Sequence, residues 1–162
     1  MILTAKILST KKHPDASKLK VCTVDTGSEK FEVVCGASNV EINMVTILAQ
    51  VGSILPSQTK IEIGELRGVK SYGMLCSAKD LNISNESGII HLDDNQELGV
   101  LYTELDKSLL SSIPWFTYKL VDTHVEKKNG IIQVVNAPIK IPEGTVISQS
   151  YWDGSKYLYR SF

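Results

Sequence analysis

The sequence predicts a mainly β protein: a small barrel or sandwich of short strands, followed by a smaller β-rich segment. Short stretches rich in aliphatic and β-branched residues recur along the chain, and glycine, proline and asparagine turns separate them. Helical patterns are confined to two short stretches. Two dipeptides typical of tight hairpins, Asn129-Gly130 and Asp153-Gly154, lie towards the C-terminal end.

The first two predicted strands, residues 2–9 and 19–25, lie on either side of a turn. His13-Pro14-Asp15 favours a turn because proline fixes its own φ and aspartate bonds to nearby backbone. Apolar stretches and Gly or Pro boundaries predict the other strands of this part at residues 31–35, 45–49, 54–56, 60–66 and 89–92.

Two short helices are expected between and after these strands. Ser77-Ala78-Lys79-Asp80 has the form of a capping box, with serine at the N-cap and an acid three positions later. This pattern predicts one or two helical turns before Leu81. Residues 103–110 predict another short helix.

The last sixty residues predict a separate β element. Strands at residues 115–125 and 131–135 flank Asn129-Gly130, and strands at 145–152 and 155–159 flank Asp153-Gly154. Two hairpins of this kind are marginally stable alone, so we expect them to pack on the first domain or on another subunit. The predicted domains are therefore residues 1–100 and a β-rich C-terminal extension at residues 101–162.

The charge pattern limits the classes of function. The chain has 162 residues and a net charge of −1, which argues against binding a polyanion by bulk charge alone. Residues 6–20 nevertheless contain five lysines and a single acid, Asp15. This basic patch is either a binding surface or a solvated loop.

Nothing in the sequence predicts a catalytic residue, a metal or a cofactor. Motifs for hydrolases, P-loops, zinc proteases and dinucleotide binding do not occur. Cys22, Cys35 and Cys76 form no CxxC pair and no disulfide framework. With no long apolar segment and no secretory leader, we expect a cytoplasmic protein.

Four segments in order carry a family resemblance: residues 13–19 (HPDASKL), 34–40 (VCGASNV), 51–56 (VGSILP) and 66–77 (LRGVKSYGMLCS). Their order and spacing resemble the tRNA-binding domain near the N-terminus of phenylalanyl-tRNA synthetase β subunits. The same domain occurs in some methionyl-tRNA synthetases, in endothelial monocyte-activating polypeptide and in CsaA-like proteins. The resemblance covers about residues 2–100.

The resemblance implies an OB-fold, five-stranded barrel over residues 1–100 that binds tRNA by shape and backbone contacts, with a role in protein biosynthesis. The RNA-binding residues predicted from it and from the charge pattern are Lys11, Lys12, Lys18, Lys20, Asn39, Arg67, Lys70, Ser71, Gly73, Met74 and Ser77. Long basic side chains beside the first turn and in the loop bracketed by Gly68 and Gly73 reach phosphates. A helix N-terminus at Ser77 would favour an anion, and Met74 would lie against a base or ribose.

Structural roles compete with several of these assignments. Arg67-Gly68 is alternatively a simple turn, Met74 a core residue, Ser77 a cap and Asn39 a turn-closing residue. His13, beside Pro14, is expected to be structural.

Three functions remain open at this level. The first is tRNA binding, by a free-standing protein or by part of a phenylalanyl-tRNA synthetase β-like protein. The second is a CsaA-like chaperone or protein-interaction module, which a large exposed apolar patch without a basic rim would favour. The third is a scaffold whose function lies in the extension. The partners expected are tRNA, an aminoacyl-tRNA synthetase and a second copy of the chain, which would form a homodimer through the extension.

Overall fold

The structure is a computed structural model that describes the whole chain except residues 118–123, 129, 136–148, 153–156 and 161–162. It divides into two compact units, residues 1–114 and residues 115–162.

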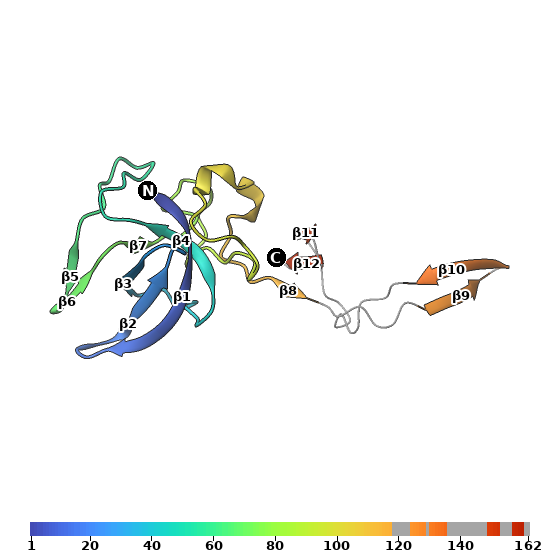
Figure 1. Cartoon of the computed structure of the whole chain (residues 1–162), viewed down its shortest axis with the longest axis horizontal. Coiled ribbons are helices and arrows are strands. Elements are labelled where there is room, and N and C mark those ends of the chain that lie inside the picture. The colour runs from blue at the N-terminus through green and yellow to red at the C-terminus, as the bar shows by residue number, and fades with distance from the viewer. Residues whose placement is uncertain (118–123, 129, 136–148, 153–156, 161–162) are drawn as a thin grey trace. The chain divides into compact units, whose positions relative to one another are not determined.

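A five-stranded antiparallel sheet forms the first unit (Figure 1). Its order is β3-β2-β1-β4-β7, from strands β1 (Ile2–His13), β2 (Ala16–Asp25), β3 (Lys30–Cys35), β4 (Val45–Ala49) and β7 (Met74–Leu75). The first half of β1 pairs with β4, and the second half pairs with β2. A register shift between Ile7 and Ser9 lies where β1 passes from one partner to the other. Such bulges bend and twist a strand, which lets β1 belong to both sides of a rolled sheet.

The two edges of this sheet approach each other. Strand β6 (Val69–Ser71) pairs with β5 (Gly64–Leu66) in a short hairpin that precedes β7. At the end of β6, the Tyr72 backbone N–H donates to the Glu32 carbonyl of β3 (2.8 Å), and the Val34 N–H donates to Ser71 Oγ (3.0 Å). These bonds join β3 to the segment that leads into β7. The prediction of a mainly β fold is confirmed, and its five strands form one antiparallel sheet; closure of this sheet into an OB-fold barrel stays a prediction.

The core of the first unit lies on both faces of β4. Leu48 belongs to a cluster inside the rolled sheet, with Ile7 of β1 and Val24 of β2. Because side chains alternate along a strand, Val45, Ile47 and Ala49 point the other way, into a second cluster covered by residues 76–110. Leu110 is part of that second cluster, so the first unit continues beyond residue 100.

In place of the one or two helical turns predicted after Ser77, the structure has hydrogen-bonded turns over residues 78–82. The capping-box bonds do form: Ser77 N–H donates to Asp80 Oδ2 (2.8 Å), and Asp80 N–H donates to Ser77 Oγ (3.1 Å). Asn82, however, has a positive φ of 54°, and the Ile83 N–H donates to the Ala78 carbonyl (2.9 Å). A left-handed residue followed by this bond ends a helix, so the turn stops before a second one forms.

Other predicted elements are shorter in the structure. In place of the helix predicted at residues 103–110, the structure has two 3₁₀ turns, η1 (Tyr102–Glu104) and η2 (Lys107–Leu109). The predicted strands at residues 54–56 and 89–92 contribute only isolated bridges, Ile54 to Lys60, Ser77 to Ile89 and Val45 to Leu92. No helix in the described part of the chain is long and apolar enough to span a membrane.

The second unit contains a hairpin and a small sheet. Strand β9 (His124–Lys128) pairs with β10 (Ile131–Val135), and Lys128 opposes Ile131, as expected for a two-residue loop. Strands β11 (Gln149–Trp152), β12 (Tyr157–Arg160) and β8 (Phe116–Thr117) form the sheet. The C-terminal hairpin prediction is confirmed, whereas Asn129 and the Asp153-Gly154 turn lie outside the described residues.

A buried arginine organises that small sheet. Arg160 is fully buried, and its guanidinium carbon lies 3.9 Å from the centroid of the Trp115 ring. The Trp115 and Tyr151 rings pack with centroids 5.9 Å apart. A cation over an aromatic face is stabilised by the ring's quadrupole, and this contact helps a small unit to hold together.

Candidate nucleic-acid interface

The β1–β2 hairpin turns at Pro14-Asp15 and carries His13 at its end. His13 is only 4% exposed. Its Nδ1 accepts a hydrogen bond from the Asp15 backbone N–H (3.0 Å), and its Nε2 lies 2.7 Å from the Leu66 carbonyl oxygen. Because Nδ1 accepts, the ring proton lies on Nε2, which donates to Leu66. His13 therefore joins the β1–β2 hairpin to the β5–β6 hairpin.

The β5–β6 hairpin turns at Arg67-Gly68. Leu66 opposes Val69, and both loop residues have positive φ, 47° for Arg67 and 86° for Gly68. Two-residue hairpin loops favour this conformation, but glycine and asparagine adopt it more readily than arginine. Arg67 is exposed, and its Nη1 donates to the Asp15 carbonyl (3.1 Å). A second bond thus links the same two hairpins.

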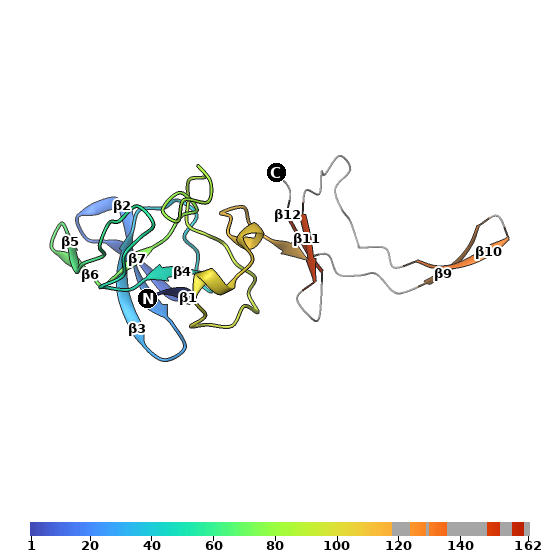
Figure 2. The same cartoon turned by 90° about the horizontal axis from the view of Figure 1, so that it is seen from above.

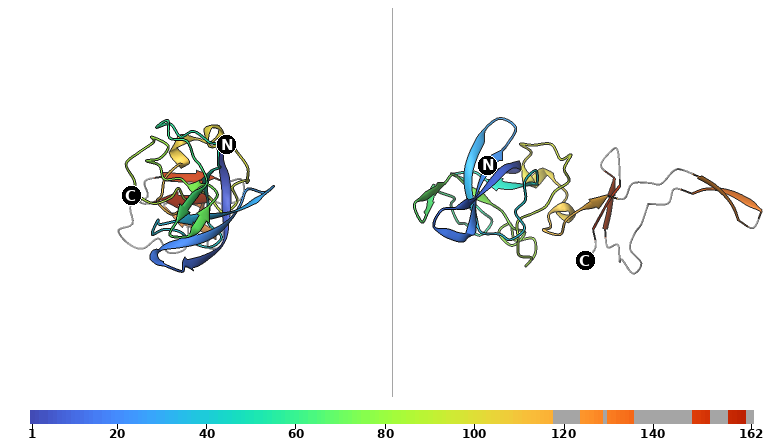
Figure 3. Two further views of the ribbon diagram at one scale, coloured as in Figure 1. Left: turned by 90° about the vertical axis from the view of Figure 1, so that its left-hand side faces the viewer. Right: turned by 90° about the horizontal axis from the view of Figure 1, so that it is seen from below.

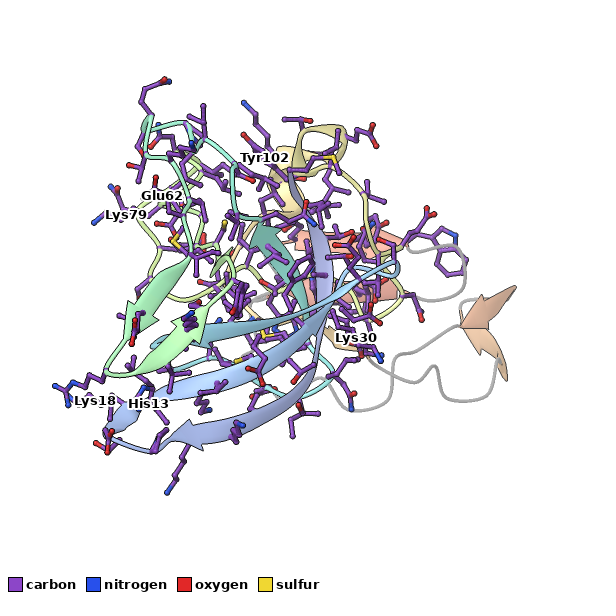
Figure 4. The ribbon with its side chains drawn as sticks, turned by 60° about the vertical axis from the view of Figure 1, so that its left-hand side comes forward. His13, Lys18, Lys30, Glu62, Lys79 and Tyr102 are labelled. Atoms are coloured by element: carbon purple, nitrogen blue, oxygen red, sulfur yellow. The ribbon has the colours of Figure 1, made fainter. Side chains whose placement is uncertain are left out.

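Five exposed cations lie on these two hairpins and form what we call the basic hairpin surface: Lys11, Lys12, Lys18, Arg67 and Lys70. Figures 2 and 3 show the β5–β6 hairpin and the β1–β2 hairpin at the same end of the first unit. Figure 4 shows His13 and Lys18 at this end, whereas Lys30 and Lys79 lie elsewhere. Within residues 1–114, none of the five is ion-paired to a carboxylate.

Lys20 occupies a different environment from the five exposed cations. It is half-buried, and its Nζ donates to the Val40 carbonyl (3.1 Å). Lys12 lies directly opposite Lys20 in the β1–β2 register. Like charges in this position repel each other, so an anion bound between them would relieve an unfavourable interaction.

Three of the predicted site residues are used by the fold. The Asn39 side chain accepts from the Ile89 N–H (2.9 Å) and donates to the Ile89 carbonyl (2.8 Å). Ser71 is buried, and its Oγ accepts from Val34 and donates to the Gly73 carbonyl (3.0 Å). Gly73 has a φ of 131° and packs against β4. These contacts give all three residues a positioning role.

Met74 and Ser77 lie together beside a small open pocket of about 250 Å³. Cys35, Gly36 and Ala37 also line it, so two of the four family segments meet there. Ser77 uses both its N–H and its hydroxyl as donors to Asp80. The expected helix N-terminus is therefore absent from residues 77–82, and Ser77 as an RNA contact stays a prediction.

Tyr72 is a further candidate that the sequence patterns did not select. It is 37% exposed, and its backbone is fixed by the bond to Glu32. The other aromatic residues of the first unit, Phe31 and Tyr102, are half-buried. An exposed aromatic ring two residues from Lys70 is suited to base stacking. Side chains two positions apart along a strand point to the same side, so the spacing of Lys70 and Tyr72 is the signal in the sequence that indicates this role.

The cysteines do not form a reactive site. Burial raises the pKa of Cys22 to about 11 and that of Cys76 to about 12, and it also raises the pKa of Cys35. Their thiols therefore stay protonated near neutral pH and are poor nucleophiles and metal ligands. Within the described ranges, no group of three or more His, Cys, Asp or Glu residues is placed to hold a metal ion.

A rolled β-sheet carrying two linked basic hairpins is typical of a nucleic-acid-binding domain, and comparison with known proteins identifies the class. Residues 2–101 match the family described as "Putative tRNA binding domain", which covers more than half of the chain. The chain belongs to this family of tRNA-binding domains.

The curated relatives are named as phenylalanine–tRNA ligase beta subunits. That of Syntrophotalea carbinolica is 46% identical over 99 residues, covering 60% of this chain and 12% of the relative. That of Ehrlichia ruminantium strain Gardel is 49% identical over 98 residues, covering 57% and 12%. That of Ehrlichia canis is 44% identical over 114 residues, covering 67% and 14%. The chain thus spans only 12–14% of the length of these relatives.

Proposed function

We propose that this chain is a tRNA-binding module whose basic hairpin surface contacts the phosphate backbone of tRNA. One observation carries the proposal: two hairpins from the region that matches the family bring exposed cations to the same end of the domain. Phosphate contacts supply most of the affinity and carry no sequence information. Binding by shape and backbone is therefore what this surface supports.

The chemistry of the site supports binding rather than catalysis. The thiols are buried and protonated, and the exposed groups of the basic hairpin surface are cations that suit phosphate contact. Because the relatives are named as subunits of a ligase, we propose that the module acts with an aminoacyl-tRNA synthetase. Self-association through residues 115–162 is a further part of the proposal, which sedimentation of the whole chain would test.

The chaperone alternative is not favoured. The exposed apolar side chain nearest the hairpin turn, Leu66, directly precedes Arg67. Cations therefore border the apolar surface at this end, which is the arrangement expected of an RNA-binding protein.

A gel-shift titration tests the proposal. Bulk tRNA and a DNA duplex of similar length would be titrated with the whole chain at several salt concentrations. We expect tighter binding of tRNA, with log K falling linearly against log salt. Equal affinity for both nucleic acids, or an affinity for tRNA that does not respond to salt, would contradict a phosphate-led tRNA site.

Arg67→Asn should separate stability from binding. Asparagine adopts positive φ more readily than arginine, which offsets the loss of the bond from Arg67 to the Asp15 carbonyl, so the free energy of unfolding should change by no more than about 1 kcal/mol. Affinity for tRNA should fall about fivefold, because one phosphate contact is lost. Urea unfolding and tRNA titration measure the two effects. A variant that loses stability and binding in parallel would show that Arg67 serves the fold instead.

A further inference from the structure

His13 is nearly buried, yet both of its ring nitrogens are used, and by two different hairpins. Nδ1 accepts from Asp15 on its own hairpin, and Nε2 donates to Leu66, which is 53 residues further along the chain. His13 directly follows Lys12 and precedes the turn that leads to Lys18. Neither nitrogen is left to contact a ligand.

A second bond runs in the opposite direction between the same hairpins. The Arg67 side chain donates to the Asp15 carbonyl, while the His13 side chain donates to the Leu66 carbonyl. Each hairpin therefore gives one side chain to the backbone of the other. We call these two bonds the hairpin junction.

The β5–β6 hairpin needs such a junction. Each of its strands is three residues long, and an isolated two-stranded hairpin is marginally stable in water. The base of this hairpin is held by the hydrogen bonds of Tyr72 and Ser71 to Glu32 and Val34 of β3. Its turn, which carries Arg67, is held to the β1–β2 hairpin by the junction.

From this geometry we propose that His13 is a positioning residue for RNA binding. In its neutral form, with the proton on Nε2, it fixes the β5–β6 hairpin against the β1–β2 hairpin. The cations of both hairpins then form one preformed phosphate-binding surface. A surface ordered before binding loses less conformational entropy when the ligand arrives. The inference rests on the proposed function for its effect on affinity, but the junction itself is a property of the free protein.

His13→Ala removes one of the two junction bonds and leaves every lysine and arginine of the sequence unchanged. We expect tRNA affinity to fall about tenfold, with the slope of log K against log salt unchanged, because the number of phosphate contacts stays the same. A neutralised phosphate contact, by comparison, flattens this slope by about 0.7 to 0.9. The slope therefore distinguishes a positioning residue from a contact residue. His13→Gln keeps a donor for the Leu66 carbonyl, so it should recover part of the affinity.

Nuclear magnetic resonance on the free protein supplies the independent readout. In the wild type, the His13 ring should show a protonated Nε2 and an unprotonated Nδ1. In His13→Ala, the amides of Arg67 and Gly68 should become more mobile, whereas those of β4 should not change. If His13→Ala does not fold, the same two measurements on His13→Gln and the ring nitrogen signals of the wild type decide the matter.

Two kinds of failure are distinguishable. Wild-type protein that does not bind tRNA overturns the proposed function. The NMR signals of the His13 ring nitrogens and of the Arg67 and Gly68 amides then test the hairpin junction by themselves. Wild-type protein that binds, together with a His13→Ala variant that binds equally well or keeps a rigid β5–β6 turn, overturns the inference. A flattened salt slope in His13→Ala would also overturn it, because His13 would then be a contact.

Discussion

Neutralising the basic hairpin surface should lower tRNA affinity by on the order of several hundredfold when Lys12, Lys18, Arg67 and Lys70 are all replaced by alanine. Alanine replacement of one pair alone, either Lys12 and Lys18 or Arg67 and Lys70, should lower the tRNA affinity about twentyfold at physiological salt. The reason is counterion release: each lost phosphate contact removes about 0.7 to 0.9 from the salt slope. Different tRNAs should be affected about equally, because phosphates carry no sequence information.

The stability of the Lys12 and Lys18 variant should hardly change, whereas the variants without Arg67 also lose its junction bond to the Asp15 carbonyl. The four side chains are exposed, and exposed charges contribute up to about 1 kcal/mol. Replacing Lys12 also removes its repulsion with Lys20 on the opposite strand. Fluorescence anisotropy of labelled tRNA at several salt concentrations measures the binding, and urea unfolding measures the stability.

Lys127 and Lys128 of β9 provide the matched control. They carry the same charge as either pair but lie outside the residues that match the family. If replacing them weakens binding as much as replacing a hairpin pair, general surface charge and not a site explains the affinity.

Local sequence patterns predict a strand best where an apolar run and the turn residues at its ends agree. Residues 45–49 are apolar and bounded by turn residues, and β4 has these bounds. Residues 89–92 are equally apolar, but there the pattern reports burial and not pairing. Ile89, Ile90 and Leu92 are all buried, yet only two single bridges form. An apolar run alone does not distinguish a buried strand from a buried loop.

Local patterns also miss strands that form without an apolar pattern. Lys11, Lys12 and His13 have no strand-like hydrophobic alternation, and yet they extend β1 to its end because β2 supplies their pairing partners. The capping box at Ser77 correctly indicates where a turn starts. The stop signal, Asn82 at positive φ, is only five residues later and limits the segment to one turn.

The candidate site shows the same limit at longer range. Charge and the family resemblance together are enough to select Lys11, Lys12, Lys18, Arg67 and Lys70, which are exposed, although they also select Lys20, which is half-buried. Whether the two clusters meet depends on the two bonds of the hairpin junction, and no local pattern reports contacts across 52 or 53 residues. The sequence allows Asn39 either a turn role or a binding role for the same reason, since its partner Ile89 is 50 residues away.

Gly73→Ala should be strongly destabilising, at about 2–4 kcal/mol. Gly73 has a φ of 131°, which side chains rarely adopt, and a Cβ atom there would lie 2.8 Å from the Ala49 carbonyl oxygen and 3.0 Å from Leu48 Cδ1. Both neighbours are fully buried in β4, so neither can move without disturbing the core. Relief by shifting Gly73 would break the pairing of Ala49 with Met74 and move the end of the β5–β6 hairpin.

Two other glycines separate the effect of backbone strain from that of the steric clash. Gly68 has a positive φ of 86°, but a Cβ atom there would have no neighbour within 4 Å, so Gly68→Ala should cost only about 1 kcal/mol from backbone strain. Gly64 also has open space and no such φ, so Gly64→Ala should be close to neutral. Hydrogen exchange of the buried β1 and β4 amides in the whole chain measures all three. If Gly73→Ala loses no more amide protection than Gly68→Ala, the close packing of Gly73 against β4 does not contribute to the stability of the first unit.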